Sequence, residues 1–348
     1  SGTITVTRPG SGTVTASSGH TNIATVSVSG TTITVTAKAT GSATITVSVG
    51  ADTNYTAPSS KTFTVAVTLV SKTLSSNSWA VIKAVSDAGQ GANYWSIGAT
   101  KSVTINGKVG ATTISSLKVD AFIIGFNHNS SKEGSNRIHF LLGKISGKFV
   151  GLVDSSYGST TSTSGAFTMN TSNTNSGGWG SSQMRSKVLG SASSPTSPTA
   201  NTLLAALPSD LRAVMKSCTK YTDNKGGSNT ASNVSSTTDY LFLLAEYEVF
   251  ATHQYCNDAE PNYQAQYDYF KAGNSKVANK HSATGTAAVW WLRSPNYYII
   301  YSSFCAVSSS GSLDYNNANN AYGVVPGFCN AWSHGVATVS YTHLRAHE

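Results

Sequence analysis

Charged residues are scarce in this chain of 348 residues, where Asp, Glu, Lys and Arg together make up 11%. Ser, Thr, Gly, Asn and Ala dominate instead, a composition typical of extracellular or virion proteins rich in β-structure. The lysines are scattered singly between Lys38 and Lys280, so the net charge of +8 does not indicate nucleic-acid binding. No run of 18 or more apolar residues is present, and no membrane insertion is expected.

Cysteine is also scarce, with four widely separated positions: Cys218, Cys256, Cys305 and Cys329. Their spacing does not resemble a zinc site, so neither a metal nor another cofactor is expected. Apolar neighbours such as Phe304 and Phe328 favour small buried thiols. Three disulfide pairings stay open if all four cysteines are oxidised.

Residues 1–70 carry short alternating apolar runs separated by Gly-, Ser- and Asn-containing turns, such as Ile45/Val47/Val49. Several closely spaced strands predict a small β-sandwich. The segment ATVSVSGTTITVTAKATGSATITVSV, followed by NYTAPSSKTFTVAV, resembles the bacterial Ig-like domains of group 2, which occur on surface and phage-tail proteins. This resemblance implies an all-β Ig-like spacer domain at 1–70, followed by a linker at 71–78.

The pattern changes after the linker. Residues 79–89 fit a short amphipathic helix with Ser76 or Asn77 as its N-cap, and strand-like runs follow at 102–105, 119–126, 138–142 and 148–153. We expect further helices at 177–190 and 203–215, the latter broken at Pro208, whereas 240–250 fits either a buried strand or a short helix. Mixed helices and strands without a βαβ rhythm predict an α+β domain.

Several motifs in this second part occur together: GGWG with Met184-Arg185, LPSDLRAVMK, TDYLFLLAEYEVF, QYDYFKAGNSK, WWLRSP and the closing GVVPGF. Together they resemble the DUF6273-type C-type-lectin-fold proteins, close to the formylglycine-generating-enzyme-like branch, that serve as variable proteins of diversity-generating retroelements. The resemblance implies an α+β C-type-lectin-fold domain at 79–332 that binds ligands through a hypervariable C-terminal region.

The segment between the motifs WWLRSP and GVVPGF is the candidate binding region. It consists mostly of Tyr, Ser and Asn, and it lacks Lys, Arg, Glu, Gln, Met and Trp. Such a mixture is typical of antibody paratopes, since it gives broad contact at low side-chain entropy cost. The predicted ligand-binding residues are Asn296, Tyr297, Tyr298, Ile299, Ile300, Tyr301, Ser302, Ser303, Ser308, Ser310, Leu313, Asp314, Tyr315, Asn316, Asn317, Asn319, Asn320 and Tyr322.

The same segment agrees with the mutational mechanism that the resemblance implies. In those retroelements, mutagenesis at adenines acts mainly on AAC codons, so a diversified position is limited to residues that NNC codons encode. Every residue from Asn296 to Tyr322 belongs to that set. The Asn cluster at 316–320 would then be unmutated or reverted template codons, and the alternative is a simple polar turn.

Two fixed motifs bracket this segment. Trp290, Trp291 and Leu292 on one side and Val324 and Phe328 on the other are expected to pack in the core and hold the loop. We interpret Arg293 as a structural arginine that hydrogen-bonds loop carbonyls or a carboxylate. Phe304, Cys305, Val307 and Gly311 are expected to point inward.

Other classes of site have weaker signals. Glu260-Pro261-Asn262 spells the EPN of calcium-dependent lectins, but the WND that accompanies it there is absent and nearby acids are few. Glu246 and Glu248 fit an ion pair or capping acceptor better than an acid/base couple. The formylglycine-generating enzymes need a closely spaced cysteine pair, which Cys305 and Cys329 do not form in sequence.

These observations predict a binding protein and no enzymatic activity. We expect it on a phage tail or bacterial cell surface, where it would recognise a cell-surface protein or glycan of a bacterial host. The alternatives are a calcium-dependent carbohydrate-binding lectin or a formylglycine-generating-like enzyme on the same scaffold, or a structural fibre module, and oligomer formation stays open. Residues 333–348 depart from the family, and VSYTHLRAHE resembles a translated sequencing-adaptor tail, so we expect an artefact there.

Overall fold

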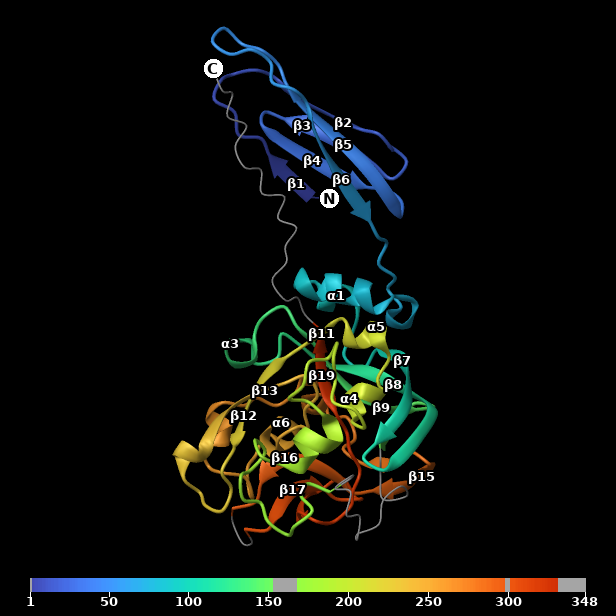
Figure 1. Ribbon diagram of the computed structural model, residues 1–348, viewed down its shortest axis with the longest axis vertical. Coiled ribbons are helices and arrows are strands. Elements are labelled where there is room, and N and C mark those ends of the chain that lie inside the picture. Colours follow the sequence, from blue (N-terminus) through green and yellow to red (C-terminus); the bar gives the residue numbers. More distant parts are fainter. Residues whose placement is uncertain (1, 153–167, 298–300, 331–348) are drawn as a thin grey trace. The chain divides into compact units, whose positions relative to one another are not determined.

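The chain divides into two compact units between Ser71 and Lys72 (Figure 1). The computed structural model describes residues 2–152, 168–297 and 301–330. The predicted artefactual tail at 333–348 therefore lies outside the described residues.

The first unit consists of two three-stranded antiparallel sheets, ordered β1-β4-β3 and β2-β5-β6. Their strands are β1 (Gly2–Thr5), β2 (Val14–Ser18), β3 (Ala24–Ser29), β4 (Thr32–Ala37), β5 (Gly41–Val49) and β6 (Lys61–Val67). Alternating apolar residues from both sheets, among them Ile33 and Ile45, form one core. The tight connection from β3 to β4 uses Gly30, whose φ of 60° favours glycine.

The second unit is built on an eight-stranded sheet. Its main path is β11-β19-β9-β10-β14-β15, while β8 pairs with β9 and β7 pairs with β8. The strands are β7 (Thr100–Val109), β8 (Thr112–Phe126), β9 (Ile138–Ile145), β10 (Lys148–Gly151), β11 (Met215–Lys216), β14 (Ala278–Lys280), β15 (Ala283–Ala288) and β19 (Gly327–Asn330). The last strand of the described residues, β19, thus lies inside the sheet, antiparallel to both β9 and β11.

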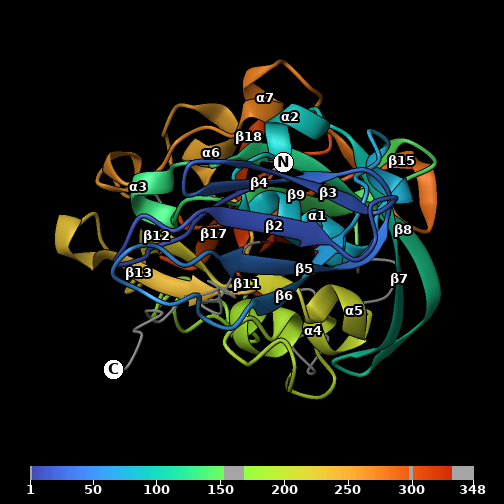
Figure 2. The same ribbon diagram turned by 90° about the horizontal axis from the view of Figure 1, so that it is seen from above.

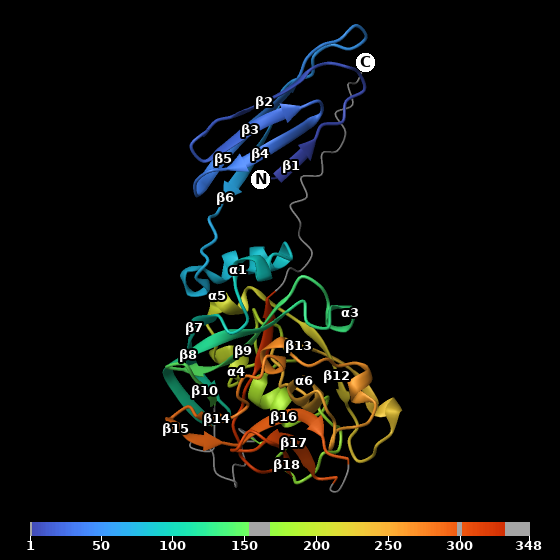
Figure 3. The ribbon, with the colours of Figure 1, turned by 180° about the vertical axis from the view of Figure 1, so that it is seen from behind.

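Two smaller antiparallel sheets complete this unit. One pairs β12 (Cys218–Asp223) with β13 (Val234–Asp239), and the other has the order β16-β17-β18, with β16 (Trp290–Pro295), β17 (Ser303–Val307) and β18 (Leu313–Asn317). The β12–β13 and β7–β8 hairpins lie on opposite sides of the unit (Figure 2). Within the same unit, the β16–β18 sheet lies at the end opposite α1 (Trp79–Asp87) (Figure 3).

The helices of the second unit are short. Helix α1 has nine residues, and the other α-helices of the described residues have four or five. They are α2 (Gly91–Tyr94), α3 (Ser130–Glu133), α4 (Leu203–Ala206), α5 (Ser209–Arg212), α6 (Glu246–Phe250) and α7 (Asp268–Lys271). The unit also has the 3₁₀ turns η1 (Leu74–Ser76), η3 (Ala231–Asn233) and η4 (Glu260–Asn262) and the six-residue π-helix η2 (Met184–Leu189). The N-cap of α1 is Ser78, whose side chain accepts from Val81 N, and not the predicted Ser76 or Asn77.

The predicted fold class, an α+β C-type-lectin-fold domain with an N-terminal all-β Ig-like sandwich, is wrong. The structure is mostly β-sheet: 39% of it is strand, arranged in several sheets, and 16% is helix. An α+β C-type-lectin fold is not evident. The helix predicted at 177–190 explains part of the error. Gly177 and Gly178 adopt positive φ values of 83° and 51°, which stop a right-handed helix from forming there, and only the six-residue π-helix η2 follows.

An aromatic cluster ties α1 to the large sheet. Phe328 of β19 stacks on Phe140 of β9 with ring centroids 5.1 Å apart, and Trp79 meets both rings edge-on at 6.0 and 5.7 Å. All three side chains are buried. Phe328 of the closing GVVPGF motif therefore belongs to the core, as the sequence predicts.

Candidate functional site

The motif WWLRSP forms β16, and every residue of β16 and β17 is buried. Trp290 Nε1 donates to the carbonyl of Lys276 at 2.9 Å, and Trp291 packs edge-on against Tyr322 with ring centroids 5.2 Å apart. Both tryptophans are fully buried, which confirms that they belong to the core. Only the outer strand, β18, brings partly exposed side chains to the surface of this sheet.

Arg293 is the main polar anchor of β16. Its guanidinium donates to Glu248 through Nη1 at 2.5 Å and Nη2 at 2.9 Å, and Nη1 also donates to the carbonyl of Leu243 at 2.8 Å. Arg293 and Glu248 are both fully buried. The structural role predicted for Arg293 is confirmed, and Glu248 is the buried ion-pair partner that the sequence predicts in this segment.

Glu248 also belongs to a larger buried network. Lys220 Nζ donates to Glu248 Oε1 at 3.0 Å, to Glu133 Oε2 at 2.8 Å and to the Tyr267 hydroxyl at 2.7 Å. Burial acts to raise the pKa of Glu248, but the charges of Arg293 and Lys220 hold it well below its usual value. The network is therefore an ionised, hydrogen-bonded core that joins β12, β16 and α6.

Asn175 supports the candidate binding segment from beneath. Its Nδ2 donates to the carbonyls of Asn296 and Ser303 at 2.8 and 3.1 Å, and its Oδ1 accepts from Gly227 N at 3.2 Å. Its own N–H donates to the carbonyl of Tyr301 at 3.1 Å. One buried amide thus fixes the backbone on both sides of residues 298–300. Asn175 carries no local sequence signal for this role and was not predicted.

Most of the predicted contact residues lie at the surface. Tyr301 is 61% exposed, and Ser310 and Asn317 are also exposed. Those that are partly buried are Tyr297, Ser302, Ser308, Leu313, Asp314, Tyr315, Asn316, Asn319, Asn320 and Tyr322. Tyr298, Ile299 and Ile300 lie outside the described residues. We call the exposed and partly buried set the variable face.

Two predicted contact residues need correction. Asn296 and Ser303 have 0% and 1% of their surfaces exposed. Their carbonyls bind Asn175, and Asn296 N donates to Ser303 O at 2.9 Å, so both residues close the base of the loop. Neither side chain is accessible to a macromolecular ligand.

A second segment of the chain borders the variable face. The Tyr297 hydroxyl donates to Asp258 Oδ1 at 2.8 Å, and Asn229 Nδ2 donates to Asp258 Oδ2 at 2.8 Å. Burial and the bond to Asp258 raise the pKa of Tyr297 to about 12. Tyr255 meets Tyr315 edge-on with centroids 4.8 Å apart. Tyr255 and Asp258 were missed, because nothing in their sequence context places them beside residues 297–315.

Residues 161–331 match the DUF6273 domain model, a domain of unknown function. The match covers β11 to β19, and hence Arg293 and the variable face, whereas β7 to β10 lie before it. No curated protein and no solved structure matches the chain. The DUF6273 match names a family without a known activity, so chemistry must be argued from the residues themselves.

The EPN motif within the DUF6273 region is not arranged as a surface calcium site. Glu260 is fully buried, and its carboxylate accepts from Asp223 N at 3.0 Å, Ser294 Oγ at 2.7 Å and Gln264 Nε2 at 3.0 Å. Burial raises the pKa of Glu260 to about 7. Glu260 therefore links η4 to β16 through Ser294. The EPN motif was the main sequence feature in favour of a calcium-dependent lectin, and its buried carboxylate no longer supports that alternative.

The other acid of the pair in α6 is also structural. Glu246 is fully buried, and its carboxylate accepts from the backbone N–H groups of Tyr255 and Cys256, the latter at 2.8 Å. The thiol of Cys305 lies 3.3 Å from Glu246 Oε2, whereas the thiol of Cys329 lies 3.3 Å from His139 Nδ1. Cys305 and Cys329 thus have different partners, unlike the cysteine pair of a formylglycine-generating enzyme.

All four cysteines are buried and free. Two groups of side chains in the described residues bring three possible metal-ligating atoms within 4.8 Å of one another: His139, Cys218 and Cys329, and His128, Glu133 and Glu248. Both groups are buried, and none of their residues belongs to the variable face. Among the described residues, no helix has the length and apolar character needed to cross a membrane.

Proposed function

We propose that this protein is a variable ligand-binding protein that recognises a partner on a bacterial cell surface through the variable face. The observation that carries the proposal is the contrast within one short segment. β16 and β17 are completely buried, while β18 and the adjoining turns offer partly exposed Tyr, Asn, Ser and Asp side chains. A rigid base beneath a polar, aromatic surface is suited to recognition.

The chemistry of the variable face favours a macromolecular partner. Tyr301, Tyr315 and Tyr322 offer aromatic rings with a polar tip, and Tyr255 extends this surface from another part of the chain. Asp314 is the only ionisable carboxylate between residues 296 and 322. Recognition here would therefore rest on aromatic contact and amide hydrogen bonds more than on charge, as in antibody paratopes.

The arrangement also suits a diversified protein. Every residue between Asn296 and Tyr322 belongs to the set that NNC codons encode, as expected for a variable protein of a diversity-generating retroelement. Exposed positions tolerate substitution because changes away from packing contacts usually alter stability by less than about 0.5 kcal/mol. On this proposal, the protein is displayed on a phage tail or bacterial cell surface and binds a host protein or glycan.

The test compares cell binding by the full chain and by two matched double variants. Fluorescently labelled protein is incubated with a panel of bacterial strains, and strains that bind it are identified by flow cytometry. We expect Tyr301→Ala with Asn317→Ala to weaken binding by about tenfold or more, since aromatic residues at the centre of an interface carry most of its free energy.

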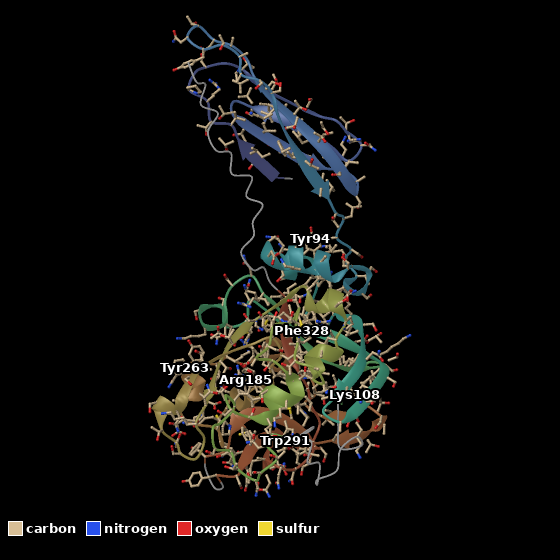
Figure 4. The ribbon with its side chains drawn as sticks, in the orientation of Figure 1. Tyr94, Lys108, Arg185, Tyr263, Trp291 and Phe328 are labelled. Atoms are coloured by element: carbon tan, nitrogen blue, oxygen red, sulfur yellow. The ribbon has the colours of Figure 1, made fainter. Side chains whose placement is uncertain are left out.

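The matched control is Tyr94→Ala with Asn93→Ala in α2, at the other end of the same unit from β16 (Figure 4). It removes the same two residue types and should leave binding unchanged. Equal binding by both double variants and the unaltered chain would contradict the proposal, and so would equal loss in both.

A further inference from the structure

Three buried side chains from three different strands converge beneath the large sheet. His139 lies on β9, Cys218 on β12 and Cys329 on β19, and each has 0% of its surface exposed. Glu133, at the end of α3 and 3% exposed, faces the same point. No local pattern in the sequence indicates this cluster, because His139 and Cys329 lie 190 residues apart.

Three of the distances between these atoms match those between ligands around one small cation, and the ligand atoms of His139, Cys218 and Cys329 all lie within 4.8 Å of one another. The Cys329 thiol lies 3.3 Å from His139 Nδ1, the Cys218 thiol lies 3.4 Å from Glu133 Oε2, and His139 Nδ1 lies 3.7 Å from the same carboxylate oxygen. In a tetrahedral zinc site, with bonds of about 2.0 to 2.3 Å, neighbouring ligand atoms are separated by about 3.3 to 3.8 Å.

We propose that His139, Cys218 and Cys329 bind one zinc ion, with Glu133 Oε2 as the fourth ligand. Thiolate, imidazole and carboxylate are each ligands that zinc binds, and four of them complete a tetrahedral site. The site is separate from the variable face and does not depend on the function proposed for that face.

Charge balance supports this assignment. Burial raises the pKa of the Cys218 thiol well above its usual value. Binding of one divalent cation releases one proton from each thiol and leaves the total buried charge unchanged. Glu133 keeps its ion pair with Lys220 at 2.8 Å, which offsets the negative charge of a site with three anionic ligands.

Neighbouring groups decide which lone pairs of these side chains can bind the metal. The Tyr267 hydroxyl lies 3.1 Å from His139 Nδ1, and it accepts from Lys220 Nζ. The metal would bind the Nδ1 lone pair of His139 in place of the Tyr267 hydroxyl. That hydroxyl would still accept the hydrogen bond from Lys220. The other group, His128 with Glu133 and Glu248, shares Glu133 with the proposed site and holds the Lys220 ammonium between its two carboxylates, so we assign no second cation there. Among the four ligands of the proposed site, Lys220 hydrogen-bonds only to Glu133 Oε2.

A metal at this point would join β9, β12 and β19. It would tie the C-terminal strand of the described residues to the middle of the large sheet, with a stabilising effect like that of a disulfide in a loop-rich protein.

The experiment measures metal in the full chain after purification without chelators. Inductively coupled plasma mass spectrometry should find about one zinc per folded chain. Cys218→Ser and Cys329→Ser should each lower this content by about tenfold, because loss of a ligand weakens a closed site severely. The matched controls are Cys256→Ser and Cys305→Ser, which remove equally buried thiols beside Glu246 and should keep the zinc.

A second measurement needs no substitution, in case a variant fails to fold. Cobalt reconstitution of the unaltered chain should give thiolate-to-cobalt charge-transfer absorption with the strong visible bands of tetrahedral cobalt. A folded chain that binds neither zinc nor cobalt, a Cys218–Cys329 disulfide found by mass spectrometry, or equal metal loss in the controls would overturn the proposal.

Discussion

Arg293 and Glu248 form a two-point ion pair with no exposed surface on either partner, through Nη1–Oε2 at 2.5 Å and Nη2–Oε1 at 2.9 Å. This pair joins β16, the base of the variable face, to α6. The same carboxylate also binds Lys220 and the backbone N–H of Ala245. Loss of either partner would leave a buried charge without compensation.

We therefore expect Glu248→Gln to lower the free energy of unfolding of the second unit by about 3 to 5 kcal/mol. Chemical denaturation followed by tryptophan fluorescence measures this change. The comparison is Asp87→Asn, which removes the partly exposed Lys83–Asp87 pair on α1 and should cost less than about 1 kcal/mol. Similar small losses in both variants would show that the buried pair contributes little.

The side chain of Asn175 makes three hydrogen bonds to backbone groups, and two of them hold the loop. Asn175→Ala leaves the carbonyls of Asn296 and Ser303 without this donor and should lower the free energy of unfolding by about 2 to 3 kcal/mol. The matched change Asn317→Ala, at an exposed position, should alter it by less than about 0.5 kcal/mol. Equal effects in a urea titration would mean that Asn175 does not hold the loop.

The contact between Tyr297 and Asp258 gives a prediction about a pKa. The side-chain hydrogen bond from Asn229, and next that from Tyr297, lowers the pKa of Asp258. Tyr297→Phe should therefore raise that pKa toward its usual value, and Asn229→Ala should raise it further. An NMR titration of the Asp258 carboxyl carbon measures both shifts, while Tyr301→Phe serves as the control that should cause none. An unchanged pKa of Asp258 in the Tyr297→Phe variant would show that Tyr297 and Asp258 are not in contact at the border of the variable face.

Glu260 gives the protein a distinctive dependence on pH. Its pKa in the fold is about 7, raised by burial from an ordinary value of 4.5, so the folded state holds this proton more tightly than the unfolded state does. The resulting stability is complete below about pH 4.5 and is lost as the pH rises through about 7. Between pH 5 and 8 the loss amounts to about 2 to 3 kcal/mol.

Glu260→Gln keeps a neutral group at this position and should remove most of that decline. Urea unfolding of both proteins at pH 5 and pH 8 makes the comparison. The free energy of unfolding of the unaltered chain should fall more between pH 5 and pH 8 than that of the variant. Parallel pH profiles would show that Glu260 is ionised in the fold throughout this range.

Local patterns in the sequence predicted much of the secondary structure. The strand-like runs at 102–105 and 119–126 lie within β7 and β8, and the expected break at Pro208 separates α4 from α5. Apolar periodicity carries this information because it repeats within a few residues. The fold class could not be obtained in the same way, since the family motifs do not specify how short helices and several sheets are arranged.

The site was predictable to a similar extent. The motif WWLRSP correctly indicated buried tryptophans and a structural Arg293, and the polar composition of 296–322 indicated most of the surface positions. Contacts between distant residues had no such signal. Asn175 lies 121 residues from Asn296, and Lys220 lies 87 residues from Glu133. Long-range pairing of polar side chains leaves no periodic pattern along the chain.

The most direct test of the central claim is the DNA sequence around the coding region. If the variable face is diversified for ligand binding, the locus holds a reverse transcriptase and a near-identical copy of the segment that encodes residues 290–328. Differences between the two copies should fall at adenines and in codons of the variable face, while the codons of Arg293 and the two buried tryptophans agree. A complete locus with neither the second copy nor a reverse transcriptase would contradict the account.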